Sequence, residues 1–279
     1  MTDELQARND GTGTGIAIRD VTKVYETDEG RVRALQPFDL EISAGEFIVL
    51  VGPSGCGKTT MLRMLGGLIS PTQGEILVGG NQLFPRPGEP ASQAVLGRLG
   101  FVFQDANLLP WRRIWKNIAL PLEIQGEKRA SMRKRADELA GQMGIEGFLN
   151  HYPRALSGGM RQRAAIARAL SHDPPILLMD EPFGALDAMT RDTMHELLQK
   201  VWMQTHKTVV LVTHSIAEAV FLADRVVLLS SRPGRIEAVV DIPFPRPRRL
   251  ELTKGVEFGK IVSDLRNRLG ESEAPSAID

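Results

Sequence analysis

The segment that most constrains this chain is a glycine-rich loop, residues 52–59 (GPSGCGKT), which matches the pattern G-x-x-x-x-G-K-(S/T). It follows the apolar run 46–51 (EFIVLV), typical of a buried parallel strand, and precedes a helix-period stretch at 59–68. Such a loop binds phosphate, because its N–H groups point inward and the helix N-terminus attracts anions. The expected nucleotide contacts are Gly52, Pro53, Ser54, Gly55, Cys56, Gly57, Lys58, Thr59 and Thr60.

Two side chains of the loop and a second cluster have the chemistry to act on a triphosphate. Lys58 can reach the β and γ phosphates, and the Thr59 hydroxyl can coordinate Mg²⁺. Residues 176–181 (ILLMDE) form an apolar run that ends in two acids, and ligands of open α/β sheets bind at the carboxyl ends of strands. Asp180 can hold Mg²⁺, and Glu181 can orient or deprotonate an attacking water. A solvated strand end has the same local pattern, so it is the phosphate loop that favours the catalytic interpretation.

The rest of the chain alternates expected strands with expected helices, which indicates an α/β domain with a mainly parallel sheet. Residues 1–15 are expected to be a flexible lead-in, 80–97 mostly loop, and 114–150 a charged helical insert. Strands are expected at 16–25, 32–42, 46–51, 75–78, 99–104, 176–180, 208–213, 225–229 and 235–242, and helices at 59–68, 128–143, 161–170, 188–205 and 215–222.

Residues 156–163 (LSGGMRQR) give the chain a resemblance to the ATP-binding cassette (ABC) ATPases, whose signature motif is LSGGQ-like. Met160 stands where the family usually has Gln. The resemblance covers about residues 16–232 and implies the P-loop NTPase fold of that family. That fold has a mainly parallel core sheet, an antiparallel β subdomain and a helical subdomain, here at about 105–160. Ser157, Gly158 and Gly159 would complete the nucleotide site of a second subunit, so a head-to-tail homodimer with two ATP molecules at its interface is implied.

Four further positions match motifs of the family. Tyr25 resembles the aromatic residue that stacks on adenine, and Gln104 resembles the glutamine that senses Mg²⁺ and water. Asp187, in ALD, looks like the loop that touches the opposite subunit, and His214, in VTHS, looks like the switch histidine that contacts the γ-phosphate. The alternatives are a strand-core tyrosine, a surface amide and a structural histidine.

The resemblance implies ATP hydrolysis with Mg²⁺ as the cofactor. The implied catalytic residues are Lys58, Gln104, Glu181 and His214, and the implied metal ligands are Thr59, Gln104 and Asp180.

Three classes of machine could use such a cassette: an importer subunit, a nucleic-acid or ribosome-associated ATPase, and a mechanical or regulatory ATPase of the envelope. Lys+Arg and Asp+Glu both number 34, so the formal net charge is zero, which disfavours a nucleic-acid partner. No heptad pattern indicates a coiled coil. The 65 residues that follow His214 disfavour the mechanical class, whose chains usually end soon after this histidine.

Residues 104–123 (QDANLLPWRRIWKNIALPLE) and 231–235 (SRPGR) resemble the nitrate, sulfonate and taurine branch of ABC importers. That branch implies uptake of a small anion or small organic solute through a partner permease, and indirectly a solute-binding protein. The chain has no apolar run of the roughly 18 residues that a membrane helix needs. We therefore expect a peripheral protein at the cytoplasmic face of the inner membrane, with no nucleic-acid partner.

The same segment supplies candidate contacts for the permease. Leu109, Trp111 and Arg112 lie where the family docks its permease, and aromatic residues are enriched at interfaces. Trp115 and Ile118 are expected instead to pack inside the helical subdomain.

Residues 233–279 are expected to form a short C-terminal extension. The stretch 243–249 (PFPRPRR) cannot be a central strand or a helix, and its arginines are expected to belong to a solvated linker rather than to face a permease or lipid. An amphipathic helix is expected at 258–269, and disorder at 271–279.

Overall fold

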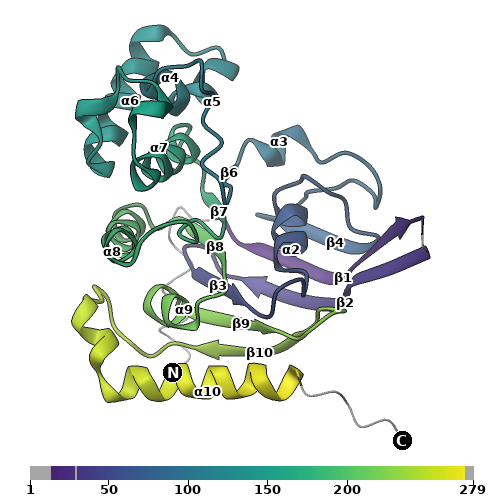
Figure 1. The fold of residues 1–279 in the computed structure, drawn as a ribbon. Coiled ribbons are helices and arrows are strands. Elements are labelled where there is room, and N and C mark those ends of the chain that lie inside the picture. Colours follow the sequence, from purple (N-terminus) through teal and green to yellow (C-terminus); the bar gives the residue numbers. More distant parts are fainter. Residues whose placement is uncertain (1–13, 29, 274–279) are drawn as a thin grey trace, which may run out of the picture.

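The computed structural model describes residues 14–28 and 30–273, which form two β-sheets and several helical layers (Figure 1). The larger sheet has six strands in the order β10-β9-β3-β8-β7-β6. Its neighbours are parallel except for β10, which is antiparallel to β9. The strands are β3 (Phe47–Val51), β6 (Leu99–Val102), β7 (Ile176–Asp180), β8 (Thr208–Thr213), β9 (Arg225–Leu229) and β10 (Ile236–Asp241). Every residue of β3, β7 and β8 is buried, which explains their continuous apolar runs.

The smaller sheet is antiparallel, in the order β2-β1-β4-β5. Its strands are β1 (Ile16–Thr27), β2 (Gly30–Ile42), β4 (Gln73–Val78) and β5 (Asn81–Gln82). Helix α2 (Lys58–Leu65) shares one hydrophobic cluster with residues of both sheets, so it packs between them. This arrangement confirms the expected fold class, a mainly parallel core sheet with an antiparallel β subdomain.

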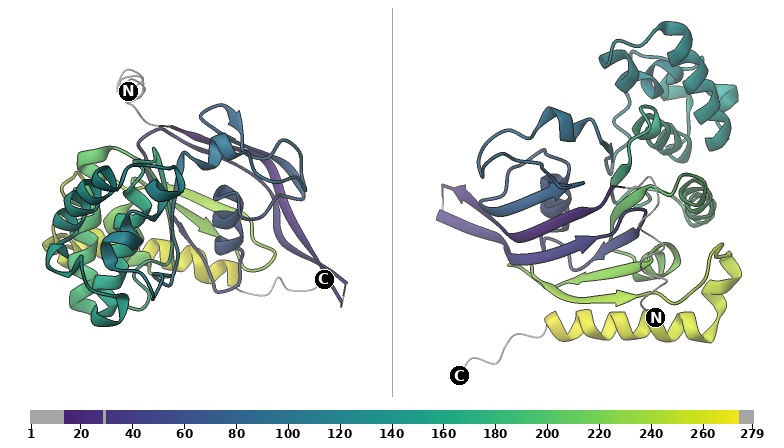
Figure 2. Two further views of the ribbon diagram at one scale, coloured as in Figure 1. Left: turned by 90° about the horizontal axis from the view of Figure 1, so that it is seen from above. Right: turned by 180° about the vertical axis from the view of Figure 1, so that it is seen from behind.

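The helical body stands at one end of the parallel sheet (Figures 1 and 2). It contains α4 (Ile114–Ile118), α5 (Leu120–Ile124), α6 (Arg129–Met143), η2 (Glu146–Phe148), η3 (Pro153–Ala155) and α7 (Gly158–Leu170). Trp115 is 7% exposed and Ile118 is fully buried, which confirms that both pack inside this body. The short helix α3 (Gln93–Leu96) lies in the stretch expected to be mostly loop.

Three further helices line another side of the parallel sheet: α8 (Ala188–Thr205), α9 (Ile216–Leu222) and α10 (Val256–Glu273), the last preceded by η4 (Leu250–Lys254). The expected amphipathic C-terminal helix is confirmed, because Phe258 and Leu265 of α10 are buried in the core. Disorder from residue 271 is wrong for 271–273, which continue the helix, while 274–279 lie outside the described residues.

A flexible lead-in is expected at residues 1–15, of which residues 1–13 lie outside the described part of the chain. For Thr14 the expectation is wrong. Its carbonyl accepts a 2.8 Å hydrogen bond from Thr208 Oγ1, and its own Oγ1 accepts one of 2.7 Å from Arg98. Thr14 therefore ties the first strand to the parallel sheet.

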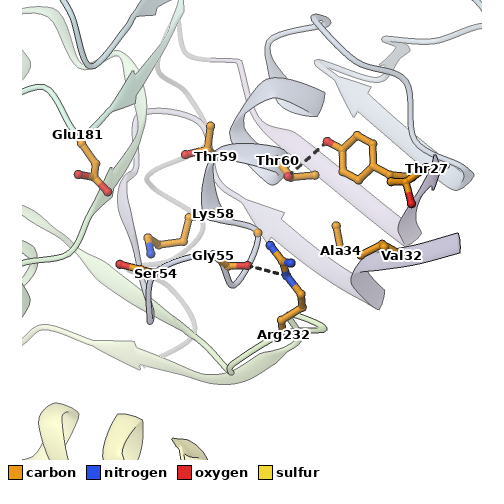
Figure 3. A pocket seen from close by; sticks show the side chains of 12 residues that line it. Thr27, Val32, Ala34, Ser54, Gly55, Lys58, Thr59, Thr60, Glu181 and Arg232 are labelled. Carbon is orange, nitrogen blue, oxygen red and sulfur yellow. Dashed lines mark hydrogen bonds between the residues drawn. The ribbon is translucent and has the colours of Figure 1, made fainter. Parts of the chain in front are cut away.

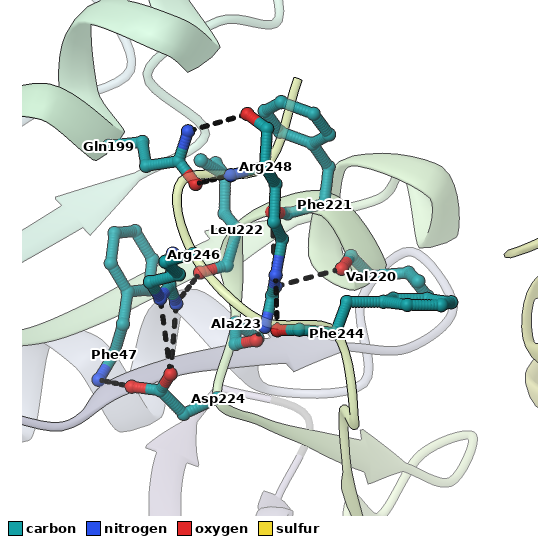
Figure 4. Close-up of polar contacts among 10 residues, drawn as sticks. All are labelled: Phe47, Gln199, Val220, Phe221, Leu222, Ala223, Asp224, Phe244, Arg246 and Arg248. Atoms are coloured by element: carbon teal, nitrogen blue, oxygen red, sulfur yellow. Dashed lines mark hydrogen bonds and ion pairs between the residues drawn. The ribbon is translucent and has the colours of Figure 1, made fainter. Parts of the chain in front are cut away.

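The expectation of a solvated linker fits Arg249, which is exposed, but it is wrong for Arg248, which is only 3% exposed (Figure 4). Its Nη1 donates to the carbonyls of Val220 (3.1 Å), Phe221 (3.1 Å) and Ala223 (2.7 Å) at the end of α9. Gln199 of α8 forms two 2.7 Å hydrogen bonds with the backbone of Arg248. The guanidinium thus satisfies carbonyls that a helix end leaves without partners. Burial, and then the positive charge of Arg246, lower the pKa of Arg248 to about 10.

Arg246 is held beside it and is also mostly buried. Its Nη2 lies 3.0 Å from Asp224 Oδ1 and also donates to the carbonyl of Leu222. Its guanidinium carbon lies 4.2 Å from the ring centroid of Trp202, a cation–π contact. Arg246 and Arg248 are therefore packed into the folded structure, although arginine side chains are usually hydrated at the surface.

No helix among the described residues is long and apolar enough to span a membrane.

Candidate functional site

A pocket of about 450 Å³ opens where the antiparallel sheet, the phosphate loop and the ends of parallel strands meet (Figure 3). Its wall comes from segments that are far apart in the sequence. The lining residues are Tyr25, Thr27, Val32, Ala34, Ser54, Gly55, Gly57, Lys58, Thr59, Thr60, Glu181 and Arg232.

The phosphate loop takes a conformation that depends on its glycines. Gly55 and Gly57 have φ angles of +77° and +104°, a region that other residues enter only with strain. Lys58 is buried at the start of α2, and its Nζ donates to the carbonyls of Gly52 (2.7 Å) and Pro53 (2.8 Å). The loop therefore encloses its lysine, and two of its own carbonyls hold the positive charge in place.

Thr59 and Asp180 meet at the edge of the pocket. The Thr59 hydroxyl donates a 3.0 Å hydrogen bond to Asp180 Oδ1, although 121 residues separate them. Burial raises the pKa of the Asp180 carboxyl, the charge of Glu181 raises it further, and the Thr59 hydrogen bond lowers it. A hydroxyl and a carboxylate that touch each other form an oxygen donor set, which is what Mg²⁺ prefers. These residues fit a magnesium ion held together with phosphate oxygens.

Glu181 lies in the same pocket, directly after β7. Its φ of +42° is unusual for a non-glycine residue, and its N–H bonds to the carbonyl of Val212 at 2.9 Å. His214, which follows β8, places Nδ1 3.1 Å from Glu181 Oε2. An ionised carboxylate can only accept, so Nδ1 is the donor. The histidine thereby orients the carboxylate at one end of the pocket.

Tyr25 lines the pocket beside Thr60, and Thr60 and Thr27 lie at the end away from Glu181 (Figure 3). Its hydroxyl lies 3.4 Å from Thr60 Oγ1, and the ammonium of Lys23 lies 5.2 Å from its ring centroid. The half-buried ring is available to a flat aromatic ligand. The pocket therefore has an ionic end and an aromatic end.

Three predicted nucleotide contacts support the loop rather than line the pocket. Gly52 and Pro53 accept from Lys58, and Cys56 is fully buried. Their side chains are small, which lets the loop close around the ammonium.

Gln104 is not brought into the pocket. The predicted strand extends to this residue, but β6 ends at Val102, and Gln104 is exposed in the following bend. As placed here, its amide does not join the other predicted ligands of Mg²⁺.

The signature residues and Asp187 also lie outside the pocket. Ser157 caps α7 by accepting from the Met160 N–H at 3.3 Å. Asp187 caps α8, with Thr190 N 3.0 Å from Oδ1 and Thr190 Oγ1 2.7 Å from Oδ2. These hydrogen bonds lower the pKa of Asp187. Gly158 is exposed, while Gly159 is buried against Thr190.

Sequence reasoning missed Arg232 as a site residue. Its Nε donates to the carbonyl of Gly55 at 3.2 Å, across 177 positions of sequence. The signal was the segment 231–235, which carries the resemblance to an importer branch, but its spacing from the phosphate loop says nothing of contact. Thr27, Val32 and Ala34 line the same pocket from β1 and β2 and were also missed.

Comparison with known proteins identifies the class of this fold and site. The ABC transporter family matches residues 35–184, more than half of the chain. An ABC transporter ATP-binding protein of Methanocaldococcus jannaschii is 43% identical over 94% of this chain and 95% of that protein. The taurine import ATP-binding protein TauB of Roseobacter denitrificans is 37% identical over 93% of this chain and 96% of that protein. The aliphatic sulfonates import ATP-binding protein SsuB of Bacillus licheniformis is 42% identical over 84% and 88%, respectively.

A solved structure agrees with this family. A dimeric ATP-binding cassette in a post-hydrolysis state, bound to ADP and Pi, has a TM-score of 0.73 and 36% identity, and it covers 82% of this chain and 100% of that chain. The chain therefore belongs to the ABC transporter family, in which it is an ATP-binding cassette with ATPase activity.

Proposed function

We propose that this chain is the ATP-hydrolysing subunit of an importer for a small anion or small organic solute of the nitrate, sulfonate or taurine type. The observation that carries the catalytic part is the pocket itself, where Glu181, held by His214, lies at one end and the Lys58 loop lies beside it. The relatives SsuB and TauB, similar over 84% and 93% of this chain, support the importer part and the solute class.

The reaction uses the chain's own groups as follows. The backbone N–H groups of the phosphate loop and the ammonium of Lys58 stabilise charge on the phosphates of ATP. Thr59 and Asp180 would hold Mg²⁺, which neutralises phosphate charge when bound. A water molecule attacks the γ-phosphorus, its proton passes to the Glu181 carboxylate, the bond to the β-phosphate oxygen breaks, and ADP leaves. His214 keeps the Glu181 carboxylate oriented through the 3.1 Å hydrogen bond.

Gln104 enters this scheme only if its segment moves. It follows β6 at the junction between the parallel sheet and the helical body, so a shift of that body would carry its amide. We assign it the role of coupling the body's position to Mg²⁺ and the attacking water.

The second half of the nucleotide site comes from another copy of the chain. Ser157 lies at the N-terminus of the 13-residue helix α7, and Asp187 at that of the 18-residue helix α8, both outside the pocket. A head-to-tail homodimer would bring the Ser157 loop of each copy against the other copy's ATP, and two ATP molecules would lie between them. The dimeric cassette with ADP and Pi supports this arrangement.

The partner of the dimer is an integral membrane permease, and indirectly a solute-binding protein. Trp111 is 71% exposed on the helical body, an unusual position for a large aromatic residue and one suited to an interface. Leu109 and Arg112 flank it, and we assign all three to the permease contact. The chain would then work peripherally at the cytoplasmic face of the inner membrane, with no nucleic-acid partner.

The test is to capture a tagged chain from detergent-solubilised native membranes and to identify its companions by mass spectrometry. We expect a polytopic permease with the wild type, and much less of it with Trp111→Ala at unchanged ATPase activity. Val256→Ala is the matched control, because Val256 is 75% exposed on α10, away from the helical body. Ribosomal or DNA-repair proteins in place of a permease would contradict the importer proposal.

A further inference from the structure

The loop between β9 and β10 puts an arginine into the nucleotide pocket. Arg232 lines the pocket beside Gly55 and Ala34, with Glu181 to one side of it and Thr27 to the other (Figure 3). Its Nε donates to the Gly55 carbonyl at 3.2 Å. Its Nη2 also lies close to Gly55, 3.5 Å from the position that a Cβ on this glycine would take. A guanidinium has five N–H donors, so this contact leaves most of them for a ligand.

The loop that carries Arg232 is tightly fixed to the site. Gly234 N donates to the Ala34 carbonyl at 3.0 Å, and Gln36 N donates to the Gly234 carbonyl at 2.8 Å, so the loop extends β2. A Cβ at Gly234 would lie 1.9 Å from the Cys56 carbonyl oxygen, so only glycine permits this approach to the phosphate loop. Arg232 is therefore presented from a rigid base, which favours a positioned contact over a mobile surface charge.

Arg232 differs from Arg235, on the same loop, in the group that its guanidinium contacts. Arg235 pairs with Glu237 at 2.8 Å and does not line the pocket. Among the described residues, the partner of Arg232 is a neutral carbonyl and not a carboxylate. A cation in a phosphate-binding pocket without a protein counter-ion is suited to an anionic ligand.

We infer that Arg232 is a nucleotide-binding residue that donates hydrogen bonds to the sugar and α-phosphate part of ATP and ADP. The position follows from the two ends of the pocket: the reacting phosphates lie toward Lys58 and Glu181, the adenine lies toward Tyr25, and Arg232 lies between them. The contact is the same for substrate and product, because both contain that part. The inference rests on the proposal that this pocket binds ATP.

The experiment measures the Kd of ADP and of ATP by titration calorimetry on the full chain with Mg²⁺. A hydrogen bond to a charged group changes binding by about tenfold or more, so Arg232→Ala should weaken both nucleotides by about that factor and to the same extent. Arg235→Ala is the matched control and should bind as the wild type does. Because salt screens charge pairs, the difference between wild type and Arg232→Ala should shrink at high ionic strength.

Two further variants separate nucleotide contact from mere support of the loop. Gln can still donate to the Gly55 carbonyl but has no charge, whereas Lys keeps the charge. We expect Arg232→Gln to bind nucleotide as weakly as Arg232→Ala, and Arg232→Lys to retain part of the affinity. Equal Kd values for wild type and Arg232→Ala, or full recovery by Gln, would overturn the inference. If the wild type bound neither nucleotide, the proposed function would fail instead.

A 2′-deoxy-ADP arm locates the contact. If Arg232 bonds the ribose 2′-hydroxyl, Arg232→Ala removes any preference of the wild type for ADP over 2′-deoxy-ADP. If it bonds the α-phosphate, that preference persists while both ligands weaken.

Discussion

Glu181 combines an acidic side chain with a backbone φ of +42°, a conformation that costs free energy in a non-glycine residue. Such strain persists where the surrounding structure fixes it, and here the hydrogen bonds to Val212 and His214 do so. Glu181→Gln keeps the shape and the hydrogen-bonding oxygen but cannot accept a proton as a carboxylate does. We expect turnover to fall by about 10²–10⁴-fold with ATP binding retained, as measured by phosphate release and equilibrium dialysis.

The same variant should accumulate as an ATP-bound dimer, because hydrolysis, after which the dimer dissociates, is nearly abolished. Size-exclusion chromatography with ATP would detect the shift in mass. Asp192→Asn, an exposed acid on α8, is the matched control and should behave as the wild type. Wild-type turnover in Glu181→Gln would rule out the assigned role.

Asp180, which we propose as a Mg²⁺ ligand, is buried at a cost in stability. Its pKa is raised by burial, so between the unfolded and folded pKa values the native state binds more protons than the unfolded state. The contribution of Asp180 to the free energy of unfolding therefore falls as pH rises between these two pKa values. At neutral pH the full cost of burying the ionised carboxylate is present. Asp180→Asn should raise the free energy of unfolding at pH 7 by about 0.5–2 kcal/mol and should abolish Mg²⁺-dependent turnover.

Urea unfolding of both proteins without nucleotide, between pH 4 and pH 8, checks this prediction. The advantage of the Asn variant should narrow toward acid pH, where the wild-type carboxyl takes up its proton. A variant less stable than wild type at pH 7 would show that Asp180 contributes net stability through Thr59 instead.

At the scale of elements, the C-terminal segment fastens α8 to α9 through Arg248. The three carbonyls at the end of α9 that Arg248 satisfies would be left buried and unbonded in Arg248→Met. Unsatisfied buried groups cost about 1–3 kcal/mol each, less whatever water recovers, so a loss of about 2–4 kcal/mol is expected in chemical unfolding. Arg249→Met is the matched control, because Arg249 is exposed. Equal losses in the two variants would contradict the capping role.

The elements that sequence predicts well here are those whose signal is local. The run 46–51, the glycine loop and the helix after it follow one another directly, so strand, turn and helix N-terminus could be placed together. The same holds for 176–181, where an apolar strand ends in two acids. Arg248 and Arg232 could not be placed in this way. Their partners are carbonyls, which have no signature in sequence, and Gly55 lies 177 residues from Arg232. Arg248 lies in a stretch of prolines and arginines, which has the composition of a linker, and only its contacts with the packed helices show that it is buried.

Gln104 shows the opposite difficulty. Its motif could be recognised from sequence, but its position depends on where the helical body stands relative to the parallel sheet. The position of the helical body depends on packing among several elements, so no short sequence pattern determines where Gln104 lies.

At the scale of the whole molecule, the separation of the Ser157 loop from the pocket can be tested by mixing two inactive chains. A chain with Lys58→Ala lacks a working phosphate loop, and one with Ser157→Arg has a blocked signature loop. In a head-to-tail dimer of the two, one composite site has both intact halves and the other has neither. Equal mixing should restore about a quarter of the wild-type sites, as measured by phosphate release.

Each inactive chain alone is the control for that experiment. A mixture that stays inactive, although both variants dimerise, would show that each site is built within one chain.

The phosphate loop also has a practical consequence through Cys56. This is the chain's single sulfhydryl, and Cys56 is fully buried, with its Sγ 3.9 Å from Lys58 Nζ inside the loop. A thiol shut away from solvent reacts slowly with alkylating reagents. A cysteine introduced on the surface would then be the one fast-reacting thiol in the polypeptide, so a fluorophore or spin probe could be attached at a chosen point without first replacing Cys56.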